Sequence, residues 1–133
     1  MWRILASLAA GLVTWAVVVT LLNFGLRAAI PDYHAAEVTL QFTLAMKIGR
    51  LIEAAVASIA AGAAVGFIVL SKKWAPWLVG FVVLAMFLPV HVSLWSKFPV
   101  WYHLAFLVPL VPLAALGGSL ARGSVARRPV TAS

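Results

Sequence analysis

Four long apolar runs, separated by short polar stretches, dominate the chain. Apolar side chains occupy most positions of residues 4–26, 51–70, 77–94 and 100–120. Each run has roughly the length of 20 residues that an α-helix needs to cross the hydrocarbon core of a bilayer. The stretches between the runs are too short to form a water-soluble domain. The pattern predicts an all-α, polytopic membrane protein, with a single four-helix transmembrane bundle over residues 1–121.

The segment before the second span is ambiguous. Residues 38–44 alternate between apolar and polar side chains as a strand would, but no partner strand or turn signal accompanies them. On a helix, Thr39, Thr43 and Lys47 would instead share one polar stripe, because they are spaced four residues apart. We therefore expect an extended second transmembrane helix that begins at about residue 36.

Prolines mark particular positions in the later spans. Pro76 precedes the third span, and proline suits the first turn of a helix. Pro109 and Pro112 lie in the middle of the fourth span, where the missing backbone N–H groups predict a kink. After this span, residues 122–133 are basic, and we expect them to form a disordered cytoplasmic tail.

Composition strengthens the membrane prediction. Apolar residues make up 65% of the chain and charged residues 10%, whereas a soluble domain has about 45–50% and about 25%. The net charge of +7 comes from residues at the ends of the spans, which indicates contact with anionic lipid head groups rather than with nucleic acid. The chain has no cysteine, which excludes disulfides and thiolate metal sites.

The basic residues also predict an orientation. With four crossings, six of them fall on one side of the membrane, and Arg27 and Lys97 fall on the other. The six are Arg3, Lys72, Lys73, Arg122, Arg127 and Arg128. Because positively charged loops stay in the cytoplasm, we expect both termini on the cytoplasmic side of an inner (plasma) membrane.

Polar side chains recur at one depth in the predicted bundle. Each span carries one strongly polar residue about one helical turn below its outer end, and two basic residues precede the one in the second span. The six residues are Asn23, Lys47, Arg50, Glu53, His91 and His103. Ionisable groups inside a membrane usually face the bundle interior and mark function. We expect a polar, ligand-binding cluster at the outer end, although Arg50 and Glu53 at i,i+3 spacing would also neutralise each other.

The two histidines allow a cofactor alternative. His91 and His103 flank a short turn, so antiparallel helices should hold them at similar depth. Such a pair can ligate haem iron or another metal, but the sequence offers no well-spaced third zinc ligand. We expect no metal or cofactor, with haem at His91 and His103 as the alternative. In the simplest case, the imidazoles bond backbone carbonyls or lie in the membrane interface.

Small residues repeat every four positions along the second span. Ser58, Gly62 and Gly66 would form one stripe on a helix, with no bulky side chain to keep a neighbouring helix away. We expect helix packing along this stripe, either inside the bundle or between copies in a homo-oligomer or larger membrane complex.

The hairpin between the third and fourth spans can be compared with known membrane proteins. The segment Phe87–His103, with the sequence FLPVHVSLWSKFPVWYH, resembles a segment of small, functionally uncharacterised inner-membrane proteins of bacteria. That resemblance implies a four-helix membrane protein and does not imply any particular activity.

No motif for catalysis occurs in the chain. It contains three acidic residues, and neither a nucleophile elbow nor a metalloprotease motif is present. We therefore predict a non-enzymatic membrane protein that binds a partner subunit or a ligand at its outer polar end. The alternatives are a small oligomeric transporter that uses Arg50 and Glu53, and a haem-binding redox subunit that uses His91 and His103.

Overall fold

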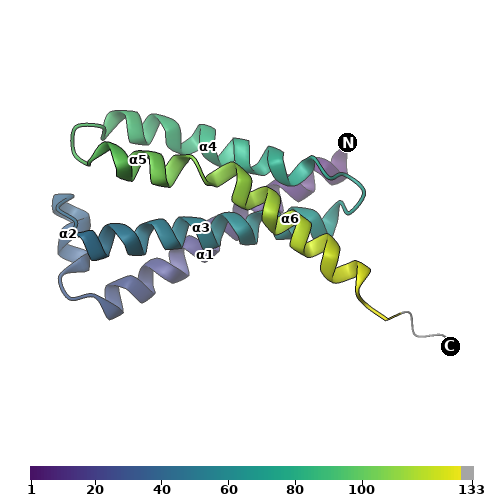
Figure 1. The fold of residues 1–133 in the computed structure, drawn as a ribbon, viewed down its shortest axis with the longest axis horizontal. Helices are drawn as coiled ribbons and strands as arrows, with labels where there is room; N and C mark the ends of the chain where they lie inside the picture. Colours follow the sequence, from purple (N-terminus) through teal and green to yellow (C-terminus); the bar gives the residue numbers. More distant parts are fainter. Residues whose placement is uncertain (130–133) are drawn as a thin grey trace.

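The computed structural model describes residues 1–129, and every regular element in that range is a helix. The helices are α1 (Trp2–Ala29), α2 (Tyr33–Thr39), α3 (Leu44–Ile68), α4 (Ala75–Ser93), α5 (Val100–Leu107) and α6 (Leu110–Ala126). Helices α5 and α6 follow one another within one span, so four helical segments are long and apolar enough to cross a membrane. The predicted four-helix transmembrane bundle is confirmed (Figure 1).

Large apolar side chains cover the outside of these helices. On α1, Val13, Val17 and Leu21 are 62%, 50% and 64% exposed, while the buried residues of this helix include the small Ser7 and Gly11. Water would solvate such a surface poorly, whereas lipid tails match it. The chain is therefore a multi-pass membrane protein.

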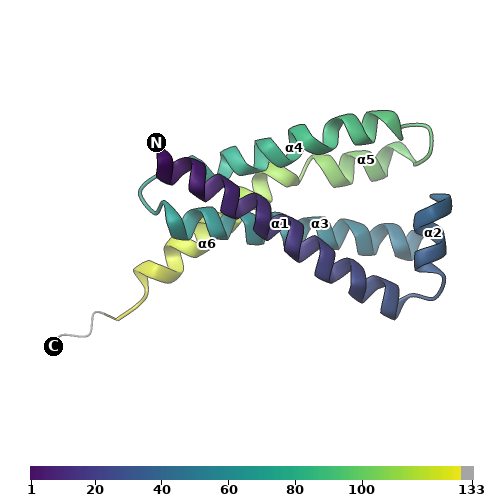
Figure 2. The ribbon, with the colours of Figure 1, turned by 180° about the vertical axis from the view of Figure 1, so that it is seen from behind.

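Helix α3 occupies the centre of the bundle. It packs against α1 on one side and α6 on the other, and α4 packs against α6 (Figures 1 and 2). Helix α2 lies across one end, beside the α4–α5 turn. We call this end the α2 end. The start of α1 and the end of α6 lie at the opposite, basic end, where the Arg3 guanidinium donates to the carbonyl oxygen of Ile68 at 3.0 Å.

The second transmembrane helix is extended, but not from residue 36. Helix α3 begins at Leu44, seven residues before the predicted span at 51, while residues 36–39 belong to the separate helix α2. Leu40 ends α2 with a φ of 59°, in the left-handed region. Thr43 then caps α3, because its side chain accepts a hydrogen bond from the Met46 backbone N–H. The predicted continuous extension is wrong for this reason.

The fourth span breaks where its prolines predict. Helix α5 ends at Leu107 and α6 begins at Leu110, with Pro109 at its N-cap. Pro112 sits in the first turn of α6, where a missing N–H leaves no helical bond unmade. The end of the span also differs from the prediction. Helix α6 continues to Ala126, so residues 122–126 are helical rather than part of a disordered tail, and residues 130–133 lie outside the described range.

The small-residue stripe of α3 lies at helix contacts. A Cβ atom on Gly62 would overlap the backbone carbonyl of Ala114, and one on Gly66 would lie 2.9 Å from the Gly118 Cα atom. Ser58 faces α1 instead, where its hydroxyl accepts a hydrogen bond from the indole N–H of Trp15 at 3.3 Å. Glycine on both helices thus lets the α3 and α6 backbones approach closely.

Candidate functional site

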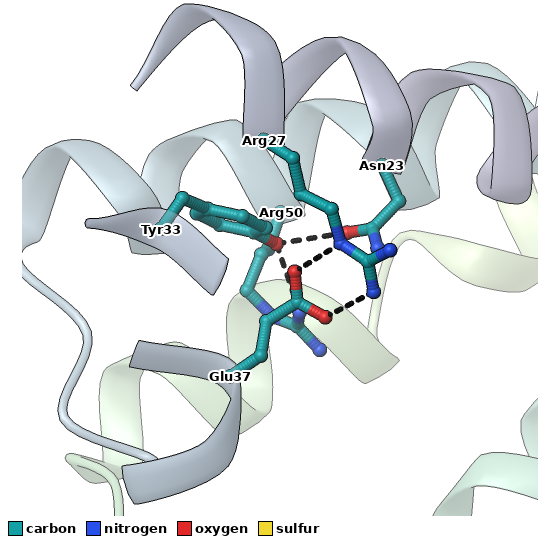
Figure 3. A network of polar contacts seen from close by, with 5 residues as sticks. All are labelled: Asn23, Arg27, Tyr33, Glu37 and Arg50. Atoms are coloured by element: carbon teal, nitrogen blue, oxygen red, sulfur yellow. Dashed lines mark hydrogen bonds and ion pairs between the residues drawn. The ribbon is translucent and has the colours of Figure 1, made fainter. Parts of the chain in front are cut away.

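Tyr33 connects three helices at the α2 end. Its side chain is fully buried, and its hydroxyl donates to Asn23 Oδ1 on α1 at 3.0 Å. The same hydroxyl accepts a hydrogen bond from Arg50 Nη1 on α3, also at 3.0 Å (Figure 3). Burial raises the pKa of Tyr33, so the hydroxyl keeps the proton that it donates to Asn23. These bonds fix α2 across the ends of α1 and α3.

The Arg50 guanidinium is held by neutral partners. Besides its bond to Tyr33, its Nε donates to the Tyr102 hydroxyl on α5 at 3.1 Å, and its Cζ lies 4.7 Å from the centre of the Phe42 ring. Such a cation–π contact stabilises a partly desolvated guanidinium. Among residues 1–129, no carboxylate lies within 4.0 Å of it. Its positive charge is therefore not neutralised by an ion pair.

Arg27 and Glu37 form the ion pair at this end of the bundle. Arg27 Nε and Nη2 donate to the two carboxylate oxygens of Glu37 at 2.8 and 2.9 Å (Figure 3). This bidentate geometry is the strongest form of such a pair. The hydrogen bond from Arg27 lowers the pKa of Glu37. Glu37 therefore stays ionised and keeps α2 bound to the last turns of α1.

Glu53 lies one turn further along α3 and is 6% exposed. In the described part of the chain, its carboxyl group has neither a hydrogen-bond donor nor a cation within 4.0 Å. The expected ion pair between Arg50 and Glu53 is thus not formed, because two tyrosine hydroxyls bind the guanidinium instead. The carboxyl oxygen atoms of Glu53 are not fully enclosed by protein, so this group retains unused capacity to bind.

A cavity of about 480 Å³ lies among α1, α2, α3, α4 and α5, and its polar wall consists of Asn23, Arg27, Glu37, Arg50 and Glu53. The polar part of the wall adjoins α2, and an aromatic part lies deeper in the bundle, where the Trp15 and Phe87 rings are 4.9 Å apart and Phe87 and Phe106 5.4 Å. The lining residues are Trp15, Val19, Thr20, Asn23, Phe24, Arg27, Glu37, Arg50, Glu53, Ala54, Phe87 and Phe106. This volume falls within the range of small-molecule sites.

The cavity reaches the lipid-facing surface beside α1. Two of its lining residues, Thr20 and Phe24, are exposed on the outside of that helix, and Phe24 is 57% exposed. Helix α1 crosses the bundle obliquely and diverges from α4 towards the α2 end (Figure 2). A molecule within the bilayer could therefore reach the cavity from the side.

His91 and His103 form a buried pair behind this cavity. Their Nδ1 atoms are 2.8 Å apart, and His103 Nε2 lies 3.2 Å from the carbonyl oxygen of Trp95. That carbonyl requires a proton on His103 Nε2, so the neutral pair has His91 Nδ1–H donating to His103 Nδ1. The Trp95 ring stacks on His103, and the His91 ring lies 4.5 Å from Phe106. The imidazoles thus support the cavity wall without lining it.

The structure divides the predicted cluster into three parts. Asn23, Arg50 and Glu53 come together around the cavity. His91 and His103 pair with each other and do not line the cavity. Lys47 is only partly buried and lies outside the cavity lining. Within residues 1–129, no three histidine, aspartate or glutamate side chains are placed to hold a metal ion.

Sequence reasoning missed four residues of this site: Tyr33, Tyr102, Arg27 and Glu37. The two tyrosines carried no distinguishing signal, since Tyr33 lies in a polar stretch and Tyr102 resembles an interfacial aromatic residue. Arg27 and Glu37 are ten residues apart, and only the turn between α1 and α2 brings them together. Their opposite charges at the two ends of one short polar stretch were the available signal.

Comparisons with family models, with curated proteins and with solved structures give no significant match.

Proposed function

We propose that this protein is a non-enzymatic membrane protein that binds a ligand in the cavity at its α2 end. The proposal rests on one observation: Arg50 and Glu53 in the cavity wall retain hydrogen-bonding capacity. Within residues 1–129, the Glu53 carboxyl group accepts no hydrogen bond and has no ion-pair partner, and the Arg50 guanidinium faces neutral partners. Ionisable groups at membrane depth are retained for function more often than for stability. A bound polar group would satisfy both side chains at once.

Binding is favoured over transport by the packing of the other half of the bundle. Towards the basic end, Gly62 lies against Ala114, and Gly66 lies against Gly118. This contact packs the α3–α6 interface tightly with small residues between Glu53 and the basic end. The haem alternative does not fit either, because an iron between His91 and His103 would separate Nδ1 atoms that here bond directly at 2.8 Å.

We place the α2 end outside a bacterial inner membrane and both termini in the cytoplasm. The support is the positive-inside rule, since the six basic residues Arg3, Lys72, Lys73, Arg122, Arg127 and Arg128 belong to the basic end. The cysteine-free chain suits a labelling test with Ser96→Cys in the α4–α5 turn and Ser71→Cys in the α3–α4 turn as a matched pair. In intact cells, an impermeant thiol reagent should label position 96 alone. Labelling of position 71 alone would reverse the orientation.

Filling the cavity should remove the ligand. Thr20→Trp places an indole where α1 borders the opening, whereas Val17→Trp places the same side chain on the lipid-facing surface of α1, away from the cavity. Native mass spectrometry after gentle detergent extraction should show a retained small molecule in the wild type and in Val17→Trp. The same species should be reduced by about tenfold or more in Thr20→Trp. Equal retention in all three proteins would place the ligand elsewhere and refute the proposed site.

A further inference from the structure

We propose that the ligand of this cavity is a zwitterionic amphiphile, with an anionic group and a primary ammonium group a few bonds apart on an apolar tail. This inference rests on the proposed function and narrows it to one chemical class. It follows from the charges of the wall, from the hydrogen-bonding groups left free, and from the shape and opening of the cavity.

Within the described residues, four ionisable side chains line the cavity, and only two of them pair with each other. Arg27 and Glu37 neutralise each other through two hydrogen bonds. Arg50 carries a positive charge, and Glu53 becomes negative when a cation lies beside it, yet the two do not bond each other. An anionic ligand would pair with Arg50 and leave the Glu53 carboxyl group unused, whereas a cationic ligand would leave Arg50 without an anion, which is unfavourable at low dielectric. A ligand with both charges satisfies the two together.

The free hydrogen-bonding groups indicate which charged group of the ligand lies beside Arg50 and which lies beside Glu53. Arg50 uses Nε and Nη1 to bind the tyrosines, and in the described chain its Nη2 donates to no acceptor. This nitrogen suits a phosphate or carboxylate oxygen. Beside a primary ammonium, the Glu53 carboxyl group is ionised and only accepts hydrogen bonds, so it suits the N–H groups of such a cation. Residues three apart on a helix have Cβ atoms about 5–6 Å apart, which calls for a short spacer between the two ligand charges.

The remaining wall suits an apolar tail. Trp15, Phe87 and Phe106 form an aromatic surface deeper in the cavity, and aromatic side chains bind apolar chains through large contact areas. The exposed Thr20 and Phe24 mark the opening towards lipid. A head group would thus lie beside α2 while its tail leaves between α1 and α4 into the bilayer.

Lipid binding to the delipidated protein in detergent tests this class directly. Phosphatidylethanolamine carries both charges and a primary ammonium, phosphatidylcholine has no ammonium N–H donor, and phosphatidylglycerol is only anionic. Native mass spectrometry should show that phosphatidylethanolamine binds about tenfold or more tightly than the other two, the ratio expected for one charged hydrogen bond. Phosphoethanolamine without a tail should bind about tenfold more weakly, which separates a lipid from a free head group as the source.

Glu53→Gln is the decisive variant, because Arg50 also holds two tyrosines and its loss would disturb the wall. Glu53→Gln should reduce the affinity for phosphatidylethanolamine by about tenfold and leave that for phosphatidylglycerol unchanged. Lys47→Gln, on the same helix but outside the cavity, should bind all three lipids as the wild type does.

The possible results distinguish a wrong ligand class from a wrong binding site. Equal binding of phosphatidylglycerol and phosphatidylethanolamine, unaffected by Glu53→Gln but reduced by Thr20→Trp, would overturn the zwitterionic class and leave the ligand-binding cavity standing. If both variants bind all three lipids as the wild type does, the zwitterionic class and the proposed site are both wrong.

Discussion

Gly62→Ala should destabilise the detergent-solubilised protein by about 3 kcal/mol or more. The added Cβ would overlap the carbonyl oxygen and carbon of Ala114. These are backbone atoms, so they cannot rotate away as a side chain could, and the whole α3–α6 contact would have to separate. Overpacking of a rigid interior costs about 1–3 kcal/mol and occasionally more. Reversible unfolding by sodium dodecyl sulfate, followed by tryptophan fluorescence, measures the difference.

Gly25→Ala is the matched control for this substitution. It makes the same chemical change on α1, but its Cβ would have nothing within 4 Å. The stability should stay the same or rise slightly, because alanine favours helix over glycine by up to about 1 kcal/mol. If Gly62→Ala and Gly25→Ala have equal stabilities, the close α3–α6 approach does not exist in the folded protein.

Tyr33→Phe combined with Tyr102→Phe should destabilise the protein by more than the sum of the single changes. Each substitution alone removes one hydroxyl that accepts from Arg50 and leaves the other bond in place. A hydrogen bond to a charged group contributes about 1.5–3 kcal/mol. With both hydroxyls gone, the guanidinium keeps its contact with the Phe42 ring but loses both oxygen acceptors, so the penalty for a desolvated charge is added to the lost bonds.

A double-mutant cycle on the free energy of unfolding measures this coupling, which should be at least about 0.5 kcal/mol. Repeating the cycle in an Arg50→Gln background supplies the control, since the coupling should disappear when the shared guanidinium is absent. Additive effects in the native background would show that Arg50 does not depend on the two tyrosines.

The sequence alone was sufficient to predict the membrane fold, because a bilayer restricts which backbone structures can cross it. Four apolar runs had to become four helices, since no other open structure satisfies its backbone within a bilayer. The break at Pro109 followed from its missing N–H. The start of α3 could not be located so well, because it depends on Leu40 in a left-handed conformation and on the Thr43 cap, which local spacing does not reveal.

The depth of the candidate residues along their helices could be predicted from the sequence, but their hydrogen-bond and ion-pair partners could not. Asn23, Arg50 and Glu53 were placed together because the helical rise fixes how far each lies along its span. The spacing of Arg50 and Glu53 favoured an ion pair, yet Arg50 binds Tyr33 and Tyr102, which are 17 and 52 residues away. Such partners are set by how α2 and α5 pack on α3, and a single sequence contains no measure of that packing.

The order of synthesis gives the α3–α6 contact a further consequence. Helix α3 is made before α6, so during translation its groove of Gly62 and Gly66 has no partner from its own chain. The groove closes only when α6, with Ala114 and Gly118, follows it into the membrane. Until then, small residues that should be covered face lipid or other proteins. Helix α6 therefore closes the groove, and a chain that ends before α6 exposes a surface of small residues that distinguishes it from the folded bundle.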